Sequence, residues 1–211
     1  MRELTQGIET FLALAPVVPV VTITDPATAV PLARSLVEGG LPVIEIALRT
    51  PCALEAIRCI STEVPDAVVG AGTVLSAHQC EQARTAGAKF LVSPGATDLL
   101  VTAARACGLP FLPGIATAGE AMRLLEMGFT FQKFFPAETA GGVAMIKALG
   151  APLPQIRFCP TGGISPSRAA EYLRLDNVIC VGGSWLTTPE SLVKRDWSTI
   201  FQLAQSATKL R

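Results

Sequence analysis

Residues 26–48 read PATAVPLARSLVEGGLPVIEIAL and contain one complete copy of the pattern that decides the fold. The first part spaces its apolar residues as an amphipathic helix does, and Gly39 and Gly40 stand where helices commonly end. The following run, 42–48, is short, apolar and rich in isoleucine and valine, as a buried strand is. This stretch therefore predicts a helix that leads into a strand.

The same unit recurs along the chain. Strand-like runs that alternate with single helices predict parallel pairing and right-handed crossovers. Eight such units predict an α/β fold, a single-domain (β/α)8 TIM barrel over residues 1–211. An open doubly wound sheet is the alternative, but no G-x-G-x-x-G follows the first run. The eight runs are 17–23, 42–48, 67–72, 89–94, 110–115, 129–135, 156–163 and 178–184.

The composition limits the kinds of partner. Half of the 211 residues are apolar, only 16% are charged, and the formal net charge is zero. No basic face stands out, so we expect neither a nucleic-acid partner nor an anionic membrane surface. No apolar run approaches the roughly 18 residues of a membrane span, and the N-terminus does not resemble a cleavable signal. We expect a cytoplasmic protein that self-associates.

The spacing of the cysteines predicts free thiols and not metal ligands. No C-x-x-C pair occurs among them, and His78 is the single histidine, so a structural zinc site is disfavoured. Apolar neighbours surround them, as expected for buried thiols in a reducing compartment. They are Cys52, Cys59, Cys80, Cys107, Cys159 and Cys180.

Polar residues gather at the expected C-terminal ends of six strands, where a barrel carries its catalytic loops. A closed barrel brings all these ends to one opening, so we expect one site there. The residues are Glu45, Arg49, Thr73, Ser93, Lys133, Thr161, Gly162, Gly163, Gly182, Gly183 and Ser184.

The segment 129–138, FTFQKFFPAE, places Lys133 among four phenylalanines. On a strand, Lys133 shares a face with Phe129, Phe131 and Phe135. One interpretation is a lysine at a strand end whose ammonium group reaches solvent. The other is a Schiff-base lysine, because an imine requires a neutral amine and apolar surroundings disfavour the ammonium form.

Glu45 lies between two isoleucines in the run 42–48. A carboxylate in a buried strand is either a structural ion-pair partner, for example of Arg49, or a general acid/base beside Lys133. Arg49 offers a planar fork of donors that fits a substrate carboxylate, or it forms a surface ion pair. Thr73 adds a hydroxyl donor. Two ionisable groups on inward strand positions favour the catalytic interpretation.

Two glycine turns follow the last two strand-like runs, in PTGGISPS and VGGSWL. Glycines allow backbone N–H groups to approach an anion, and the helix N-terminus that follows favours negative charge. In (β/α)8 barrels, the loops after the seventh and eighth strands often hold a phosphate. The two turns therefore predict a phosphate site, although tight-turn geometry alone also explains a Gly-Gly pair.

Seven motifs, in order and at matching spacing, resemble the 2-keto-3-deoxy-6-phosphogluconate aldolases, which are grouped with the 4-hydroxy-2-oxoglutarate aldolases. The resemblance begins at about Pro16 and is weakest in the first fifteen residues. It implies a class I aldolase in a (β/α)8 barrel, usually a homotrimer, that needs no metal or cofactor. The motifs are VEGGLPVIEIALRT, VVGAGTV, SPGATD, LPGIAT, KFFPAE, RFCPTGGISP and GGSWL.

The implied reaction is the cleavage of 2-keto-3-deoxy-6-phosphogluconate to pyruvate and glyceraldehyde 3-phosphate. The galactonate epimer and 4-hydroxy-2-oxoglutarate, which yields glyoxylate, remain open as substrates. By motif position, the resemblance implies that Lys133 in KFFPAE is the Schiff-base lysine and that Glu45 in E-x-x-x-R is the acid/base. Arg49 and Thr73 then hold the pyruvyl carboxylate.

The remaining contacts are implied in the same way. Pro94 and Phe135 line the pyruvyl pocket, and Thr161 lies near the hydroxyl-bearing carbons. The residues implied to bind phosphate are Gly162, Gly163, Gly183 and Ser184. Two other functions use the same barrel: a phosphosugar isomerase or epimerase, which needs no imine, and a non-catalytic phosphosugar-binding barrel. Neither gives a reason to bury Lys133 with Glu45.

Overall fold

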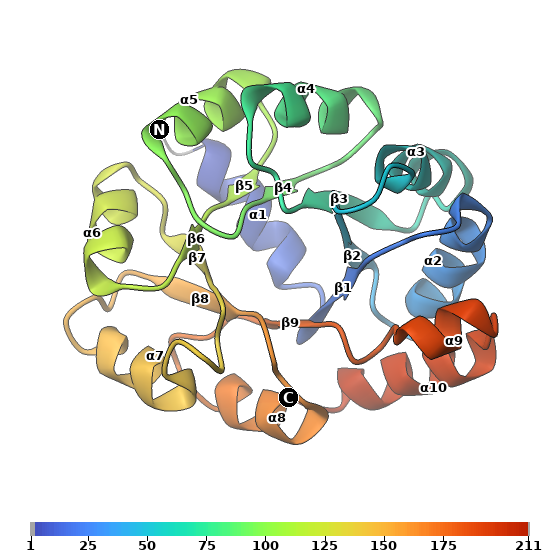
Figure 1. Cartoon of the computed structure of the whole chain (residues 1–211). Helices are drawn as coiled ribbons and strands as arrows, with labels where there is room; N and C mark the ends of the chain where they lie inside the picture. The colour runs from blue at the N-terminus through green and yellow to red at the C-terminus, as the bar shows by residue number, and fades with distance from the viewer. Residues whose placement is uncertain (1–2, 211) are drawn as a thin grey trace.

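A computed structural model describes residues 3–210. Helices surround a curled parallel sheet, and the strands run through the middle of the molecule (Figure 1). The predicted α/β class, the parallel pairing and the alternation of strands with helices are confirmed.

Nine strands occur in the described residues, and all the predicted strand-like runs contain one or two of them. Their bounds are β1 (Val17–Val21), β2 (Val43–Ala47), β3 (Val68–Gly72), β4 (Leu91–Val92), β5 (Phe111–Leu112), β6 (Gly114–Ile115), β7 (Phe131–Phe134), β8 (Arg157–Pro160) and β9 (Val181–Gly183). The fifth predicted run is divided at Pro113, because proline has no N–H with which to continue a ladder.

The longest helix in the described part of the chain, α10, has 12 residues, and none of these helices is long and apolar enough to cross a membrane. A 3-10 turn, η1 (Pro26–Thr28), precedes α2. The α-helices are α1 (Glu3–Leu12), α2 (Ala29–Glu38), α3 (Ala53–Glu63), α4 (Ala77–Thr85), α5 (Asp98–Cys107), α6 (Ala118–Glu126), α7 (Gly142–Gly150), α8 (Pro166–Leu173), α9 (Pro189–Val193) and α10 (Trp197–Thr208).

Local side-chain contacts set the helix boundaries. The Thr97 hydroxyl accepts a hydrogen bond from the backbone N–H of Leu100, which caps the start of α5. Thr117 and Glu120 form a reciprocal capping box at the start of α6. Gly108 ends α5 with φ of 77°, a left-handed conformation that suits glycine.

The strands form two parallel sheets. One has the order β5-β4-β3-β2-β1-β9, and the other has the order β6-β7-β8. Single bridges between Phe158 and Val178, and between Thr161 and Gly182, pair β8 and the residue after it with the segment that contains β9. In the β3 to β2 register, Glu45 lies opposite Gly70, and in the β6 to β7 register, Lys133 lies opposite Gly114. These registers place Glu45 and Lys133 close to the C-terminal ends of β2 and β7.

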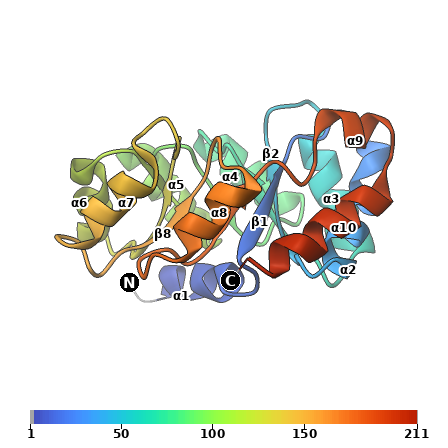
Figure 2. The same cartoon turned by 90° about the horizontal axis from the view of Figure 1, so that it is seen from below.

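Helix α1 was not predicted. It lies across the N-terminal end of the strands, below them in Figure 2, and packs against β5 and β7. Its side chains Ile8 and Leu12 are 0% and 1% exposed. α1 therefore closes the end of the fold that lies opposite the expected catalytic loops.

Two apolar layers hold the fold together. An outer layer packs the helices on the strands and includes Leu36 of α2 and Ile57 of α3. An inner layer lies among the strands and is completed by α1. Its buried members are Ile8, Leu12, Val18, Val43, Phe90, Val92, Leu112, Phe131, Cys159 and Cys180.

We predict that Leu12→Ala lowers the free energy of unfolding by about 2–4 kcal/mol, because it leaves a cavity in the inner layer. Leu14→Ala is the matched control, since Leu14 is 51% exposed and follows the same helix. The control should change that free energy by no more than about 0.5 kcal/mol. Urea unfolding followed by circular dichroism measures both. Equal losses would show that α1 does not close the inner layer.

Candidate active site

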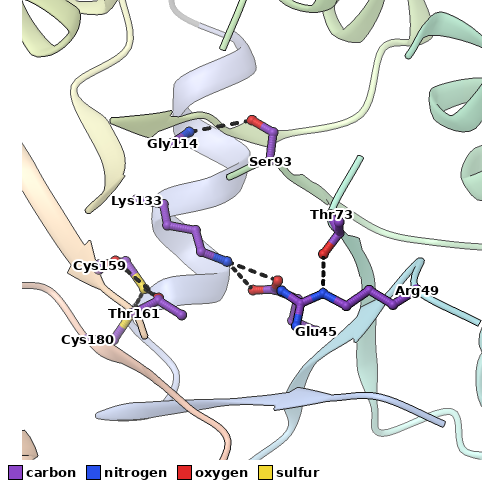
Figure 3. Close-up of polar contacts among 9 residues, drawn as sticks. All are labelled: Glu45, Arg49, Thr73, Ser93, Gly114, Lys133, Cys159, Thr161 and Cys180. Carbon is purple, nitrogen blue, oxygen red and sulfur yellow. Dashed lines mark hydrogen bonds and ion pairs between the residues drawn. The ribbon is translucent and has the colours of Figure 1, made fainter. Parts of the chain in front are cut away.

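A buried ion pair forms the centre of the site. The Lys133 ammonium donates hydrogen bonds to Glu45 Oε1 at 3.0 Å and to Oε2 at 3.3 Å (Figure 3). The two side chains are 6% and 5% exposed, although 88 residues separate them in the sequence. Two opposite charges removed from water in this way stabilise each other strongly, because few water molecules screen them.

Gly72 makes room for this pair. A Cβ atom on Gly72 would lie 2.1 Å from Glu45 Oε1 and 2.5 Å from Glu45 Cγ, closer than non-bonded atoms approach. The carboxylate therefore occupies space that any other residue at the end of β3 would fill. The sequence interpretation missed this role. Its signal was the alternation of Gly70 and Gly72 in β3, since residues two apart on a strand face the same side.

The aromatic surroundings of Lys133 differ from the prediction. Phe129 precedes β7, packs edge-on against Phe111 with ring centroids 5.9 Å apart, and belongs to the outer layer. The prediction that it shares the face of Lys133 was wrong, because the strand begins only at Phe131. The Phe135 ring centroid lies 5.6 Å from Lys133 Nζ. The nearest charged partner of the lysine is Glu45, so a carboxylate and not an aromatic shell accommodates the buried ammonium.

Arg49 and Thr73 form the next contact around the site. Arg49 Nε donates to Thr73 Oγ1 at 3.1 Å, and no ion pair between Arg49 and Glu45 occurs within the described residues. Thr73 has φ of 58°, an unusual conformation for a β-branched residue. The Arg49 side chain is exposed, which leaves its donors available to a ligand. In Figure 3 this pair lies on the Glu45 side of the central ion pair.

The end of β4 meets β6 at a close backbone contact. The Gly114 N–H donates to the Ser93 hydroxyl at 3.4 Å (Figure 3). A Cβ on Gly114 would lie 2.3 Å from the Pro94 carbonyl group, so only glycine fits there. Pro94 and Phe135 are both half-buried and follow β4 and β7. They therefore lie at the same end of the strands as the central ion pair.

Thr161 follows β8 and is 6% exposed. Its hydroxyl donates to the Cys159 carbonyl at 3.3 Å. A Cβ on Gly182 would lie 2.2 Å from Thr161 Oγ1, so a second glycine makes room for a polar side chain of the site. In Figure 3, Thr161 lies on the opposite side of the ion pair from Arg49.

Glu138 holds the first glycine turn in place. Gly162 and Gly163 have φ of 108° and 75°, values that L side chains rarely adopt. The Glu138 N–H donates to the Gly162 carbonyl at 3.1 Å. The Glu138 carboxylate accepts from Tyr172 at 2.6 Å and from Arg168 Nε at 3.2 Å. Burial and the contact with Glu138 raise the pKa of Tyr172, so its hydroxyl remains a donor.

The second glycine turn borders a cavity. Gly183 ends β9, and a Cβ on it would lie 2.4 Å from the Trp185 ring. Ser184 is exposed and lines a cavity of about 580 Å³ together with Thr22 and Thr187. The turn therefore presents a hydroxyl to open space, as an anion-binding turn must.

The predicted site residues thus lie in or just after β2, β3, β4, β7, β8 and β9, with Glu45 in the middle of β2 and Lys133 one residue before the end of β7. A buried amine and a carboxylate at hydrogen-bond distance can form an imine and transfer protons. Within residues 3–210, no group of three or more His, Cys, Asp or Glu side chains is arranged to hold a metal ion.

Comparison with known proteins identifies the family of this chain. Residues 8–203 match the family model "KDPG and KHG aldolase". The 2-dehydro-3-deoxy-phosphogluconate aldolase of Pseudoalteromonas atlantica is 52% identical over 91% of this chain and 89% of that protein. The match thus spans nearly the whole of both chains.

Two solved structures have nearly the same fold. The 2-keto-3-deoxy-6-phosphogluconate aldolase of Zymomonas mobilis, crystallised with 3-phosphoglycerate, has a TM-score of 0.93 and 48% identity, over 98% of this chain and 97% of that one. The KDPG aldolase of Legionella pneumophila, with pyruvate captured as a covalent carbinolamine intermediate, has a TM-score of 0.93 and 42% identity, over 95% of this chain and 98% of that one. From the matched motifs, the shared fold and these identities, we conclude that the chain belongs to the KDPG and KHG aldolase family.

Proposed function

We propose that this chain is a class I aldolase that cleaves 2-keto-3-deoxy-6-phosphogluconate to pyruvate and glyceraldehyde 3-phosphate, and that also accepts 4-hydroxy-2-oxoglutarate. The observation that carries the proposal is the buried hydrogen-bonded pair of Lys133 and Glu45 near the C-terminal ends of β7 and β2. The Legionella relative, in which pyruvate was captured as a carbinolamine, supports the same chemistry.

The first step is imine formation at Lys133. Glu45 Oε1, which already accepts a hydrogen bond from Nζ at 3.0 Å, takes the ammonium proton and leaves a neutral amine. The amine attacks C2 of the keto acid, and the C2 hydroxyl leaves as water with the proton that Glu45 returns, which gives a protonated imine and restores the carboxylate. This cation withdraws electrons from the C3–C4 bond. Arg49 and Thr73, joined by a hydrogen bond of 3.1 Å, hold the pyruvyl carboxylate, and Pro94 and Phe135 line the pocket around it.

The second step is carbon–carbon cleavage. The Glu45 carboxylate, acting through a water molecule, removes the proton of the C4 hydroxyl, the C3–C4 bond breaks, and the aldehyde leaves. The enamine that remains takes a proton at C3 from Glu45, and hydrolysis releases pyruvate. Thr161 lies on the other side of Lys133 from Arg49 and contacts the hydroxyl-bearing carbons.

The phosphate end of the substrate lies at the two glycine turns. Gly162 and Gly163, held in left-handed conformations, direct backbone N–H groups toward it, and Gly183 and Ser184 approach from the next strand. The Zymomonas relative was crystallised with a phosphorylated acid, which supports a phosphate-binding role in this family.

We also propose the arrangement of the whole chain. Residues 1–211 form one domain, a closed barrel of eight strand positions in which β5 and β6 count as one. The bridge between Thr161 and Gly182, together with the continuity of β5 and β6 across Pro113, supports closure. Hydrogen exchange tests this closure. Fast exchange of the backbone amides of β8 and β9, with slow exchange at the other six strand positions, would contradict a closed barrel.

The protein assembles as a homotrimer in the cytoplasm. The exposed apolar side chains Leu75, Leu99 and Met122 support self-association. The described cysteines are reduced thiols, which suits a reducing compartment. A monomer in sedimentation velocity at micromolar concentration would contradict the trimer.

We predict that borohydride reduction in the presence of pyruvate attaches a pyruvyl group to Lys133 and abolishes activity. Lys89 and Lys147 are exposed and serve as internal controls that should stay unmodified. Peptide mapping by mass spectrometry locates the adduct. A fully active enzyme with an unmodified Lys133 would refute the imine and favour an isomerase on this fold.

Activity should also persist in EDTA, and a loss of activity that a divalent metal restores would indicate a metal-dependent aldolase.

We predict that Glu45→Gln lowers kcat by at least about 10²-fold, because an amide cannot accept the proton. Glu55→Gln, at an exposed position of α3, is the matched control and should leave kcat unchanged. Exchange of deuterium into the pyruvate methyl group reports enamine protonation separately from cleavage. A wild-type exchange rate in Glu45→Gln would remove Glu45 from the proton transfer at C3.

We predict that unphosphorylated 2-keto-3-deoxygluconate has a kcat/KM about 10³-fold below that of the phosphorylated acid. Hydrogen bonds to a charged group contribute roughly 1.5–3 kcal/mol each, and a net of about 4 kcal/mol corresponds to this factor. Ser184→Ala should reduce kcat/KM for the phosphorylated acid alone, and only in part, because the backbone donors remain. Equal kcat/KM values for both acids would assign the turns a purely structural role and favour 4-hydroxy-2-oxoglutarate as substrate.

A further inference from the structure

Two cysteines lie in contact inside the fold, beside the proposed Schiff-base lysine. Cys180 donates a hydrogen bond from its thiol to Cys159 Sγ, and the two sulfur atoms are 3.5 Å apart (Figure 3). Cys159 is 3% exposed and Cys180 is 0% exposed. Cys159 lies opposite Lys133 in the register of β8 with β7. The mechanism proposed above uses neither thiol.

The backbone holds these cysteines at a spacing that suits a disulfide. Phe158 pairs with Val178 and Thr161 pairs with Gly182 in parallel bridges, and Cys159 and Cys180 lie between these two bridges. Neighbouring strands lie about 4.7–4.9 Å apart. Disulfides join Cα atoms that are about 4.4–6.8 Å apart. The two thiols therefore reach bonding distance through side-chain rotation and a small strand movement.

The surroundings activate Cys159 in particular. The hydrogen bond from Cys180 is the main cause that lowers the pKa of the Cys159 thiol. The positive charge of Lys133 acts in the same direction, whereas burial and the negative charge of Glu45 act against it. A second buried pair behaves in the opposite way. Burial raises the pKa of Cys80 to about 11 and also raises the pKa of Cys107, although Cys107 contacts the Cys80 carbonyl at 3.4 Å. The thiolate is the reactive form of cysteine.

We propose that Cys159 and Cys180 are a redox modification site, which hydrogen peroxide converts to a reversible intramolecular disulfide that lowers aldolase activity. The Cys159 thiolate attacks one peroxide oxygen, the O–O bond breaks, and hydroxide leaves and takes up the proton that Cys159 lost. The Cys180 thiol then attacks the sulfur of the Cys159 sulfenic acid, and water leaves with the Cys180 proton. Two thiols and one peroxide thus yield one disulfide and two water molecules.

The disulfide alters the site through the two strands that carry it. The sulfur atoms must move from 3.5 Å to about 2.05 Å apart. This shift pulls on Thr161, two residues after Cys159, and on the turn at Gly183, three residues after Cys180. A displacement of about 1 Å in a positioned group can reduce turnover by about 10²-fold. On the basis of the proposed function, we expect kcat/KM to fall about 10- to 100-fold on oxidation and to recover with dithiothreitol.

The test treats the full-length protein with hydrogen peroxide, alkylates the remaining thiols and maps tryptic peptides by mass spectrometry. The expected product joins peptide 158–168 to peptide 175–194, with the loss of two hydrogen atoms. Cys80 and Cys107 should be recovered as alkylated thiols. Cys180→Ser should abolish both the linked peptide and the reversible loss of activity, each measured against the untreated variant. Cys107→Ser is the matched control and should behave as the wild type.

Three results would overturn the proposal. One is the absence of the linked peptide in wild type at peroxide concentrations that oxidise the half-buried Cys52 and Cys59. Another is a linked peptide with unchanged kcat/KM. The last is an equal, reversible loss of activity in Cys180→Ser. Because mapping needs no turnover, a reduced protein without aldolase activity would refute the proposed function separately from the disulfide.

Discussion

The buried contact between Lys133 and Glu45 is the constraint on which the rest of the structure depends. An ammonium and a carboxylate that are each about 95% buried stabilise the fold only when both are present, because a lone charge in their place costs about 3–5 kcal/mol. β2 and β7 must therefore keep their relative positions closely. The inner apolar layer, which α1 closes from the opposite end, holds them there. The strongest electrostatic interaction of the site is thus also a requirement for the architecture.

Much of the fold could be predicted because its pattern is local and repeated. Every strand lies within a predicted run, since short apolar segments bounded by turn residues are read directly from neighbouring residues. Two features escaped that reasoning. Helix α1 is fixed by contact with strands distant in the sequence, such as β5 and β7. Phe129 was placed on the wrong side because strand boundaries depend on pairing, which the pattern of apolar residues does not reveal.

The types of the site residues could be predicted, but their partners only as alternatives. Polar side chains at strand ends marked Lys133, Glu45 and Arg49, because an apolar chain gives few other reasons to place charge there. The sequence left two partners open for Glu45: Arg49, which is four residues away, and Lys133, beside which Glu45 would act as a general acid/base. The structure joins Glu45 to Lys133, 88 residues away, and joins Arg49 to Thr73. Which of several nearby charges meet is decided by sheet register, and that is a property of the folded chain.

Gly72 ties the chemistry of one strand to the identity of a residue on the next. Because the Glu45 carboxylate fills the volume that a side chain at position 72 would occupy, the residue types at the two positions depend on each other. An alanine at position 72 would force the Glu45 carboxylate out of the position in which it meets Lys133. A design that transfers this activity to another parallel sheet must therefore include a glycine on the neighbouring strand together with the glutamate.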